Sequence, residues 1–454
     1  MVTDLSKEVT VGEAASPMSP AWTVSVGPNP SPAERFAAAV LTAELAAASG
    51  EAAPAEAPEE GRVIVGTEAA RAAGVSGLAP LLAGLGDDGF LITTNSTSLH
   101  VPAGSVVLAA SEGSERGPAF GAFALLKRLG FRFIAWDETI RPAPPIKPPA
   151  VDSLHLRFRP VIRMRDCMTG AVRLTANGSE THTGTSFSAA LGLNGNDAFP
   201  PVGGAVTPQR PPGFVATVMT LLSQPYVDAG HCSPHGKNCA CPEVFAAHED
   251  WFVCQPDLKC TVAQANTTFG SHVCWSVPSL QQALIASVRH RLQSSPPSAI
   301  ISVSGMDGGM DNPHTCAGDH ALNVAENTPG GANWHAVNAV AKAIATDFPR
   351  ATIETLAYQG GSAPPATLRF EPNVVTMITL NEEMQPAGHL QRGRYDRFLP
   401  LSDKQNAGAV QLLRDWIEAM GEGALWVWDH AESGSDTMIP VPNYYLLGDR
   451  IKTL

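Results

Sequence analysis

Four short apolar runs occur in the second half of the chain, and acidic or amide side chains follow each of them. The runs cover residues 298–306, 351–357, 373–380 and 424–428. Near-continuous apolar strands that alternate with helices are typical of a parallel sheet covered by helices. In barrels of this kind the chemistry takes place at the carboxyl ends of the strands. The pattern therefore predicts a site built from carboxylates.

Helical patterns of apolar residues separate these runs, at 279–292, 332–348 and 403–420. Two earlier strands are expected at 160–166 and 272–277. The alternation predicts an α/β fold with a TIM-type (β/α)8 barrel over residues 151–454. About seven strands precede Leu454, whereas a closed barrel of this type has eight. We therefore expect a barrel that is incomplete at the C-terminus.

A smaller domain is predicted before the barrel. Residues 1–30 are rich in Ser, Pro and Thr and are expected to be disordered. Residues 31–140 predict a small α/β sandwich domain with two helices. Five prolines in 141–150 form a linker, because proline cannot continue a helix or a central strand. The elements expected in this domain are helices at 32–49 and 117–129 and strands at 62–66, 90–93, 106–110 and 131–136.

Composition and charge exclude several partners. The chain has 454 residues, a formal net charge of -13 and 44% hydrophobic residues. Nucleic acids are not expected partners, since their binding requires clustered Lys and Arg. No run approaches the roughly 20 apolar residues of a membrane span. Neither a phosphate-binding loop nor a dinucleotide fingerprint is present, so no organic cofactor is expected.

Cysteines and glycosylation sequons favour a secreted or secretory-pathway protein. The chain has eight cysteines, and five of them lie between Cys232 and Cys260, within a Cys-rich insertion predicted at 232–274. Sequons begin at Asn95, Asn177 and Asn266. Disulfides are the favoured interpretation, because the Cys and His spacing in the insertion does not fit a zinc site. No metal site is predicted, and no signal peptide is visible.

Glu382 and Glu383 are the strongest catalytic candidates. Glycosidic cleavage requires a proton donor for the leaving oxygen and a group that stabilises the cationic sugar, and paired carboxyl groups provide both. The alternative is that one of the two faces solvent at the start of a loop. Asp307 is a third candidate, because the glycines around it allow a ligand close to the backbone. The same residues are also typical of an ordinary turn.

Aromatic and amide side chains at other strand ends are candidates for substrate binding. Trp426 and Trp428 share one face of a strand that ends at Asp429, so they predict either a stacking surface for sugars or part of the barrel core. Tyr358 and Gln359 are suited to bind a hydroxyl or acetamido group, although Tyr is also suited to cap a barrel layer.

Three candidates lie elsewhere in the chain. Arg165 and Asp166 end the predicted strand at 160–166, where the alternative to substrate binding is an interior ion pair. Asn443 is expected at the rim of the barrel.

Several separate pieces of the chain resemble one family. The pieces at 338–349, 354–359, 372–375, 425–429 and 440–443 resemble the glycosidase-like domain of unknown function 4838, a group that includes endo-β-N-acetylglucosaminidases of glycoside hydrolase family 163.

The segment 116–130 resembles the small α/β domain that precedes the barrel in hexosaminidases and α-glucuronidases. The resemblance implies that Asp307 is a strand-end site residue and that His231 reaches the substrate. Related proteins usually carry a Cys-x-Cys-x-x-Cys cluster after the Asp307 strand, where this chain has only Cys316. Their barrel also continues past the equivalent of Leu454.

Together these observations predict a glycoside hydrolase that acts on N-acetylglucosamine-containing glycans, by substrate-assisted retaining hydrolysis with paired carboxylates. Carbohydrate is the expected partner. Two alternatives are a catalytically inactive carbohydrate-binding protein and an exo-glycosidase similar to α-glucuronidases. The second would require a basic residue for the sugar carboxylate, for which Arg165 and Arg394 are candidates.

Overall fold

The computed structural model divides the chain into two compact units, Met1–Ala205 (unit 1) and Val206–Leu454 (unit 2). The structure describes residues 22–49, 61–94, 99–135, 138–143, 146, 153–162, 164–165, 187, 189–194, 218, 221–222, 225, 244, 247–252, 273–295, 299–305, 316–358, 362–380, 395–396, 399–420, 424–429 and 446.

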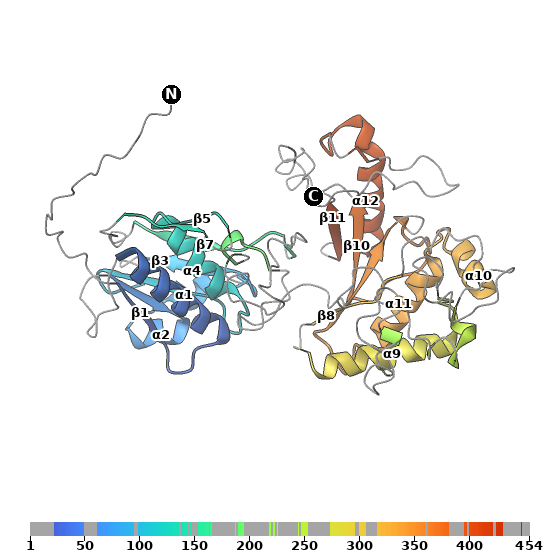
Figure 1. Cartoon of the computed structure of the whole chain (residues 1–454), viewed down its shortest axis with the longest axis horizontal. Helices are drawn as coiled ribbons and strands as arrows, with labels where there is room; N and C mark the ends of the chain where they lie inside the picture. Colours follow the sequence, from blue (N-terminus) through green and yellow to red (C-terminus); the bar gives the residue numbers. More distant parts are fainter. Residues whose placement is uncertain are drawn as a thin grey trace, which may run out of the picture. The chain divides into compact units, whose positions relative to one another are not determined.

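Unit 1 contains a five-stranded mixed sheet between two layers of helices (Figure 1). The strands, in spatial order, are β1 (Thr23–Val26), β2 (Arg62–Val65), β4 (Ser105–Ala109), β3 (Phe90–Thr93) and β7 (His155–Phe158). The helices are α1 (Pro32–Ser49), α2 (Thr67–Ala72), α3 (Leu78–Leu82) and α4 (Gly117–Arg128), and a two-stranded ribbon joins β5 (Arg132–Phe133) to β6 (Thr139–Ile140).

The two faces of this sheet carry separate hydrophobic clusters. Val63 and Leu108 pack with α1 and α4 on one face, whereas Ile64 and Val107 pack with α2 and α3 on the other. Alternation along each strand produces this division. At Gly121, a Cβ atom would come within 2.2 Å of Leu108 Cδ1, so α4 lies close against β4 because the residue is glycine.

Unit 2 contains a four-stranded sheet in which every pairing is parallel. Its order is β11 (Leu425–Asp429), β10 (Val374–Leu380), β9 (Thr352–Ala357) and β8 (Ile300–Ser302). The helices of unit 2 whose bounds lie within the described residues are α9 (Pro278–Gln293), α10 (Ala317–Ala325), α11 (Gly331–Ile344) and α12 (Ala407–Met420), with short 3-10 turns η2 (Glu249–Trp251) and η4 (Lys404–Asn406). Figure 1 shows α9 and α11 beside this sheet.

The four predicted strands and three predicted helices of this region are confirmed. The α/β fold is therefore shown, but a closed TIM-type barrel is not confirmed, because the described part of unit 2 contains four strands of one sheet.

Several predicted elements differ from the structure. Part of the segment expected to be disordered forms β1, which pairs with β2, and Trp22 donates a hydrogen bond to the carbonyl of Ile146. The strand after the Pro-rich segment, β7, pairs with β3 of unit 1, so the boundary between the compact units falls after Ala205.

Two predicted strands of the barrel are wrong within the described residues. The described residues of 160–166 form no strand, because the main chain of Arg165 pairs with Asn194 instead of with a sheet. At 273–277 an isolated bridge from Val273 to Phe252 is followed by a turn.

Candidate functional site

The carboxyl ends of β9, β10 and β11 lie along one edge of the unit 2 sheet. Leu380 pairs with Asp429, and Ile378 pairs with Ala357. Because these strands are parallel, the segments that follow them start at the same edge. Glu382 follows Leu380 by two residues, and Tyr358 follows Ala357 directly. The register therefore brings together the carboxyl ends of the three strands that precede the predicted site segments in the sequence.

The structure describes only part of the predicted site. Tyr358, Trp426 and Trp428 are described with their side chains, and Asp429 is described as the last residue of β11. The predicted site residues outside the described residues are Asp166, His231, Asp307, Gln359, Glu382, Glu383 and Asn443.

The two faces of the unit 2 sheet differ in what they contact. Side chains that pack against α9, α11 and α12 come from alternate positions, namely Ile301, Val303, Ile353, Ala357, Val374, Ile378, Leu380, Leu425 and Val427. The intervening positions point to the opposite face, because side chains alternate along a strand. We call this opposite side the open face because the hydrophobic clusters with α9, α11 and α12 do not include its side chains, although most of its described side chains are buried. Tyr358, Trp426 and Trp428 belong to it.

Burial distinguishes the two tryptophans of β11. Trp426 is buried and pairs with Met377, which is also buried. Trp428 is only partly buried, and it pairs with Thr379 one residue before the carboxyl end of β10. Trp426 thus lies in an inner layer of the open face, whereas Trp428 lies nearer its edge.

Sequence reasoning missed a buried carboxylate on the open face. Glu354 lies in the middle of β9, is 0% exposed, and pairs with Ser302 on one side and Val375 on the other. The sequence signal is an acid within an otherwise apolar strand run. Because burying a carboxylate costs free energy, an acid at such a position indicates a specific role.

Two serine hydroxyls on the open face fix the end of β8. Ser302 and Ser304 are both buried, and their Oγ atoms are 2.9 Å apart. The Leu356 N–H donates to Ser304 Oγ at 3.1 Å, so a side-chain hydroxyl here serves as an acceptor for β9. This contact lies three residues before Asp307 in the sequence.

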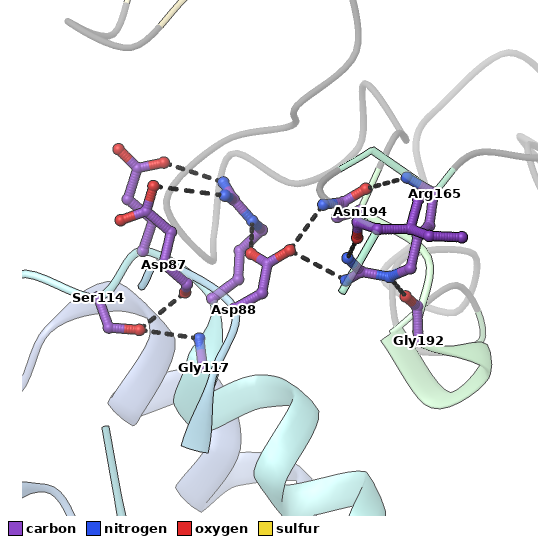
Figure 2. A network of polar contacts seen from close by, with 10 residues as sticks. Asp87, Asp88, Ser114, Gly117, Arg165, Gly192 and Asn194 are labelled. Atoms are coloured by element: carbon purple, nitrogen blue, oxygen red, sulfur yellow. Dashed lines mark hydrogen bonds and ion pairs between the residues drawn. The ribbon is translucent and has the colours of Figure 1, made fainter. Parts of the chain in front are cut away.

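Arg165 belongs to a buried polar network in unit 1 (Figure 2). Its guanidinium donates to Asp88 Oδ2 at 2.9 Å and to the carbonyls of Gly192 and Ile162, each at 2.7 Å. Asn194 donates to the same Asp88 oxygen at 2.6 Å. These contacts favour the interior ion pair over substrate binding as the role of Arg165.

A second buried carboxylate in unit 2 connects a loop to a helix end. Glu326 accepts hydrogen bonds from the main-chain N–H groups of Thr367 and Leu368 and lies 2.8 Å from His335 Nε2. Burial alone would raise the pKa of Glu326, but these hydrogen bonds outweigh burial and lower the pKa to about 2. Glu326 is therefore a structural anion.

A disulfide and a third buried carboxylate hold the turn at 273–277. Cys274 is bonded to Cys316, and Asp319 accepts hydrogen bonds from the main-chain N–H groups of Trp275 and Ser276. The predicted use of cysteines in disulfides is confirmed for this pair, whereas secretion stays a prediction. Among the described residues, no three His, Cys, Asp or Glu side chains are grouped as a metal site would require.

A family model matches most of unit 2. Residues 233–454 match the model of the family described as Domain of unknown function (DUF4838). The resemblance predicted from the sequence is thereby confirmed for this part of the chain. No curated protein matches the chain. Within the described residues, no helix is both long enough and apolar enough to span a membrane.

Two groups of solved structures are distantly similar. One is a family GH115 4-O-methyl-α-glucuronidase with specificity for decorated arabinogalactans, with 12% identity, coverage of 91% of this chain and 54% of that chain, and a TM-score of 0.45. Another is a GH20 exo-β-N-acetylglucosaminidase from Vibrio harveyi, with 12% identity, coverage of 80% and 55%, and a TM-score of 0.38. This chain spans about half the length of both proteins.

Proposed function

We propose that unit 2 is the catalytic part of a glycoside hydrolase that acts on N-acetylglucosamine-containing glycans. The observation that supports the proposal is the pairing of Leu380 with Asp429, because Glu382 and Glu383 follow Leu380 in the sequence and Asp429 ends the Trp-containing strand β11. Acids next to aromatic side chains are suited to sugars, which stack on rings and donate their hydroxyls to carboxylates. The match to the DUF4838 model over the same residues is consistent with this assignment.

The proposed reaction divides the work between two carboxyl groups. One of Glu382 and Glu383 donates its proton to the leaving glycosidic oxygen while the bond from that oxygen to C1 breaks. The acetamido oxygen of the substrate attacks C1 and forms a cyclic intermediate, and the second carboxylate orients this acetamido group. Water then attacks C1 while the bond from C1 to the acetamido oxygen breaks and the acetamido group is regenerated. The first carboxylate takes the proton of this water, which restores its starting protonation state and gives a product of retained configuration.

Activity on a chromogenic N-acetyl-β-glucosaminide tests the proposal. We expect the variants Glu382→Gln and Glu383→Gln each to lower kcat by about 100-fold or more, because each removes a proton-transfer or orienting carboxylate. Glu418→Gln is the matched control, since Glu418 lies exposed on α12. A defined N-glycan serves as the second substrate.

Three results would contradict this assignment. Saccharide binding without turnover by the unmodified chain would favour the inactive carbohydrate-binding protein. Turnover that neither Gln substitution changes would remove the two glutamates from the site. Preference for a glucuronide would favour the exo-glycosidase, which would need a basic group other than the engaged Arg165.

A further inference from the structure

The connection from β9 to β10 is held by two hydrogen bonds shortly after Tyr358, which directly follows β9. The indole Nε1 of Trp416, on α12, donates to the carbonyl oxygen of Ser362 at 2.6 Å. The hydroxyl of Thr328 donates to the next carbonyl oxygen, that of Ala363, at 3.0 Å. Side chains from two other parts of unit 2 therefore fix the chain just beyond a predicted substrate-binding residue.

Both donors are anchored in the interior of unit 2. Trp416 is 0% exposed, Thr328 is 3% exposed, and Ser362 is 1% exposed. The Trp416 ring meets the Trp334 ring edge to face, with 5.4 Å between the ring centroids. Phe370, which belongs to the same connection, lies beside both rings. Because α12 packs with β10 in one hydrophobic cluster, the carbonyl that Trp416 binds is fixed relative to the sheet.

Two glycines give the hydrogen bond at Ser362 its importance. Gly360 and Gly361 stand between Gln359 and Ser362 in the sequence. Glycine has the greatest backbone freedom of any residue and loses the most entropy when it is ordered. A segment that contains two glycines therefore keeps one arrangement more readily when both of its ends are fixed. The strand β9 provides one fixed end, and the two hydrogen bonds provide the other.

We propose that Trp416 and Thr328 are positioning residues, which keep the Tyr358–Gln359 segment in the arrangement that binds the substrate. This inference rests on the proposed function, because it assigns the support of substrate-binding residues in the same site. Neither residue has to contact the sugar. When either hydrogen bond is removed, only a fraction of the molecules is competent to bind, so the apparent affinity falls by that fraction, whereas turnover of bound substrate is unchanged.

Steady-state kinetics with a chromogenic N-acetyl-β-glucosaminide tests this role. We expect Trp416→Phe to raise KM by about tenfold and to leave kcat within about twofold, because a lost buried hydrogen bond shifts a local equilibrium by about that factor. Thr328→Val keeps the shape of the side chain and should act in the same direction. Amide hydrogen exchange in a peptide covering residues 358–363 should accelerate by a similar factor in both variants.

Trp334→Phe is the matched control. Trp334 is as buried as Trp416 and belongs to the same cluster, but its Nε1 has no hydrogen-bond partner within the described residues. This variant loses the same ring atoms without losing a hydrogen bond, so KM and the exchange of residues 358–363 should stay unchanged. Glu326→Gln is a second control, because Glu326 binds the connection farther along, at Thr367.

Circular dichroism identifies any variant that fails to fold, and Thr328→Val decides the question if Trp416→Phe is one of them. Equal KM and equal exchange in Trp416→Phe and Trp334→Phe would overturn the proposal. A lower kcat at unchanged KM would also overturn it, because that result indicates loss of active protein and not of the binding-competent arrangement.

Calorimetric titration with N,N′-diacetylchitobiose replaces KM if the unmodified chain shows no turnover. Binding that is about tenfold weaker in Trp416→Phe than in Trp334→Phe would then support the positioning role and contradict the proposed hydrolase. Equal binding by these two variants would overturn the positioning role. A failure of the unmodified chain both to bind and to cleave would overturn the two proposals together.

Discussion

Glu326 shows how one carboxylate stabilises a connection between distant residues of unit 2. It lies at the end of α10 and binds residues about 40 positions later in the chain, at 2.7 Å from Thr367 N and 3.0 Å from Leu368 N. Its own carbonyl accepts from Ala366 N–H. Removing the side chain's charge would weaken several charge-assisted hydrogen bonds together.

We expect Glu326→Gln to lower the free energy of unfolding by about 2–3 kcal/mol near neutral pH. The pKa of Glu326 is lowered in the folded state to about 2, from an ordinary value of 4.5. A carboxyl group with a lowered folded-state pKa stabilises the protein above its unfolded-state pKa, and this contribution is lost as the pH falls through the folded-state value. The difference between the variant and the unmodified chain should therefore shrink between pH 4.5 and about 2.

Urea denaturation at a series of pH values measures this difference. Glu418→Gln is the control, because Glu418 is exposed and its replacement should leave stability unchanged at every pH. A Glu326→Gln deficit that stays constant down to the lowest pH would contradict the assignment of Glu326 as a structural anion.

Single residues were the hardest feature to predict from the sequence, because their roles depend on long-range contacts. Asp88 follows Asp87 in a Gly-Asp-Asp-Gly turn, where either acid is expected to be exposed. The structure buries Asp88 because Arg116, Arg165 and Asn194 all converge on it from other segments. Glu354 stands out as an acid within an apolar strand run, but the local pattern does not say whether the sheet buries it.

At the scale of elements, apolar periodicity predicted the strands and helices that pack on both sides. The strand 374–380 is buried along its whole length, and its run of apolar residues predicted it. The edge strands β1 and β7 were missed because each buries only part of its surface and carries polar residues. The strand expected at 160–166 does not form in its described residues, because Arg165 is held by contacts with the side chains of Asn194 and Asp88 instead of by hydrogen bonds to a neighbouring strand.

The disulfide provides a prediction about one connection between elements. Cys274 and Cys316 are 42 positions apart, and a loop of this length implies about 4 kcal/mol of stabilisation from the reduced entropy of the unfolded chain. We expect Cys316→Ser to lower the free energy of unfolding by up to this amount. Urea denaturation of the oxidised and the reduced protein measures this difference in the free energy of unfolding. In the Cys316→Ser variant the Cys274–Cys316 bond is absent, so the reducing agent should not cause the loss of stability that belongs to this bond. Equal stability of oxidised protein and variant would contradict the prediction.

At the scale of the whole molecule, the described hydrophobic clusters respect the division into two units. Two clusters contain only residues of unit 1, and two contain only residues of unit 2. The sequence predicted two domains but placed their boundary at the Pro-rich segment. The compact units divide after Ala205 instead, and β7 pairs with the first sheet, which is a long-range pairing that composition does not reveal.

Separate cores predict separate unfolding transitions. Six of the eight tryptophans lie in unit 2, since only Trp22 and Trp136 precede Val206, so fluorescence should follow mainly unit 2 while circular dichroism follows both units. Asp88→Asn should lower the free energy of unfolding of unit 1 alone, by about 3–5 kcal/mol, because Arg116 and Arg165 lose the buried carboxylate with which they form ion pairs. Glu326→Gln should lower only the unit 2 transition. If either substitution shifts both transitions by the same amount, the two units unfold as one cooperative structure, and the division of the chain into two energetically separate cores is wrong.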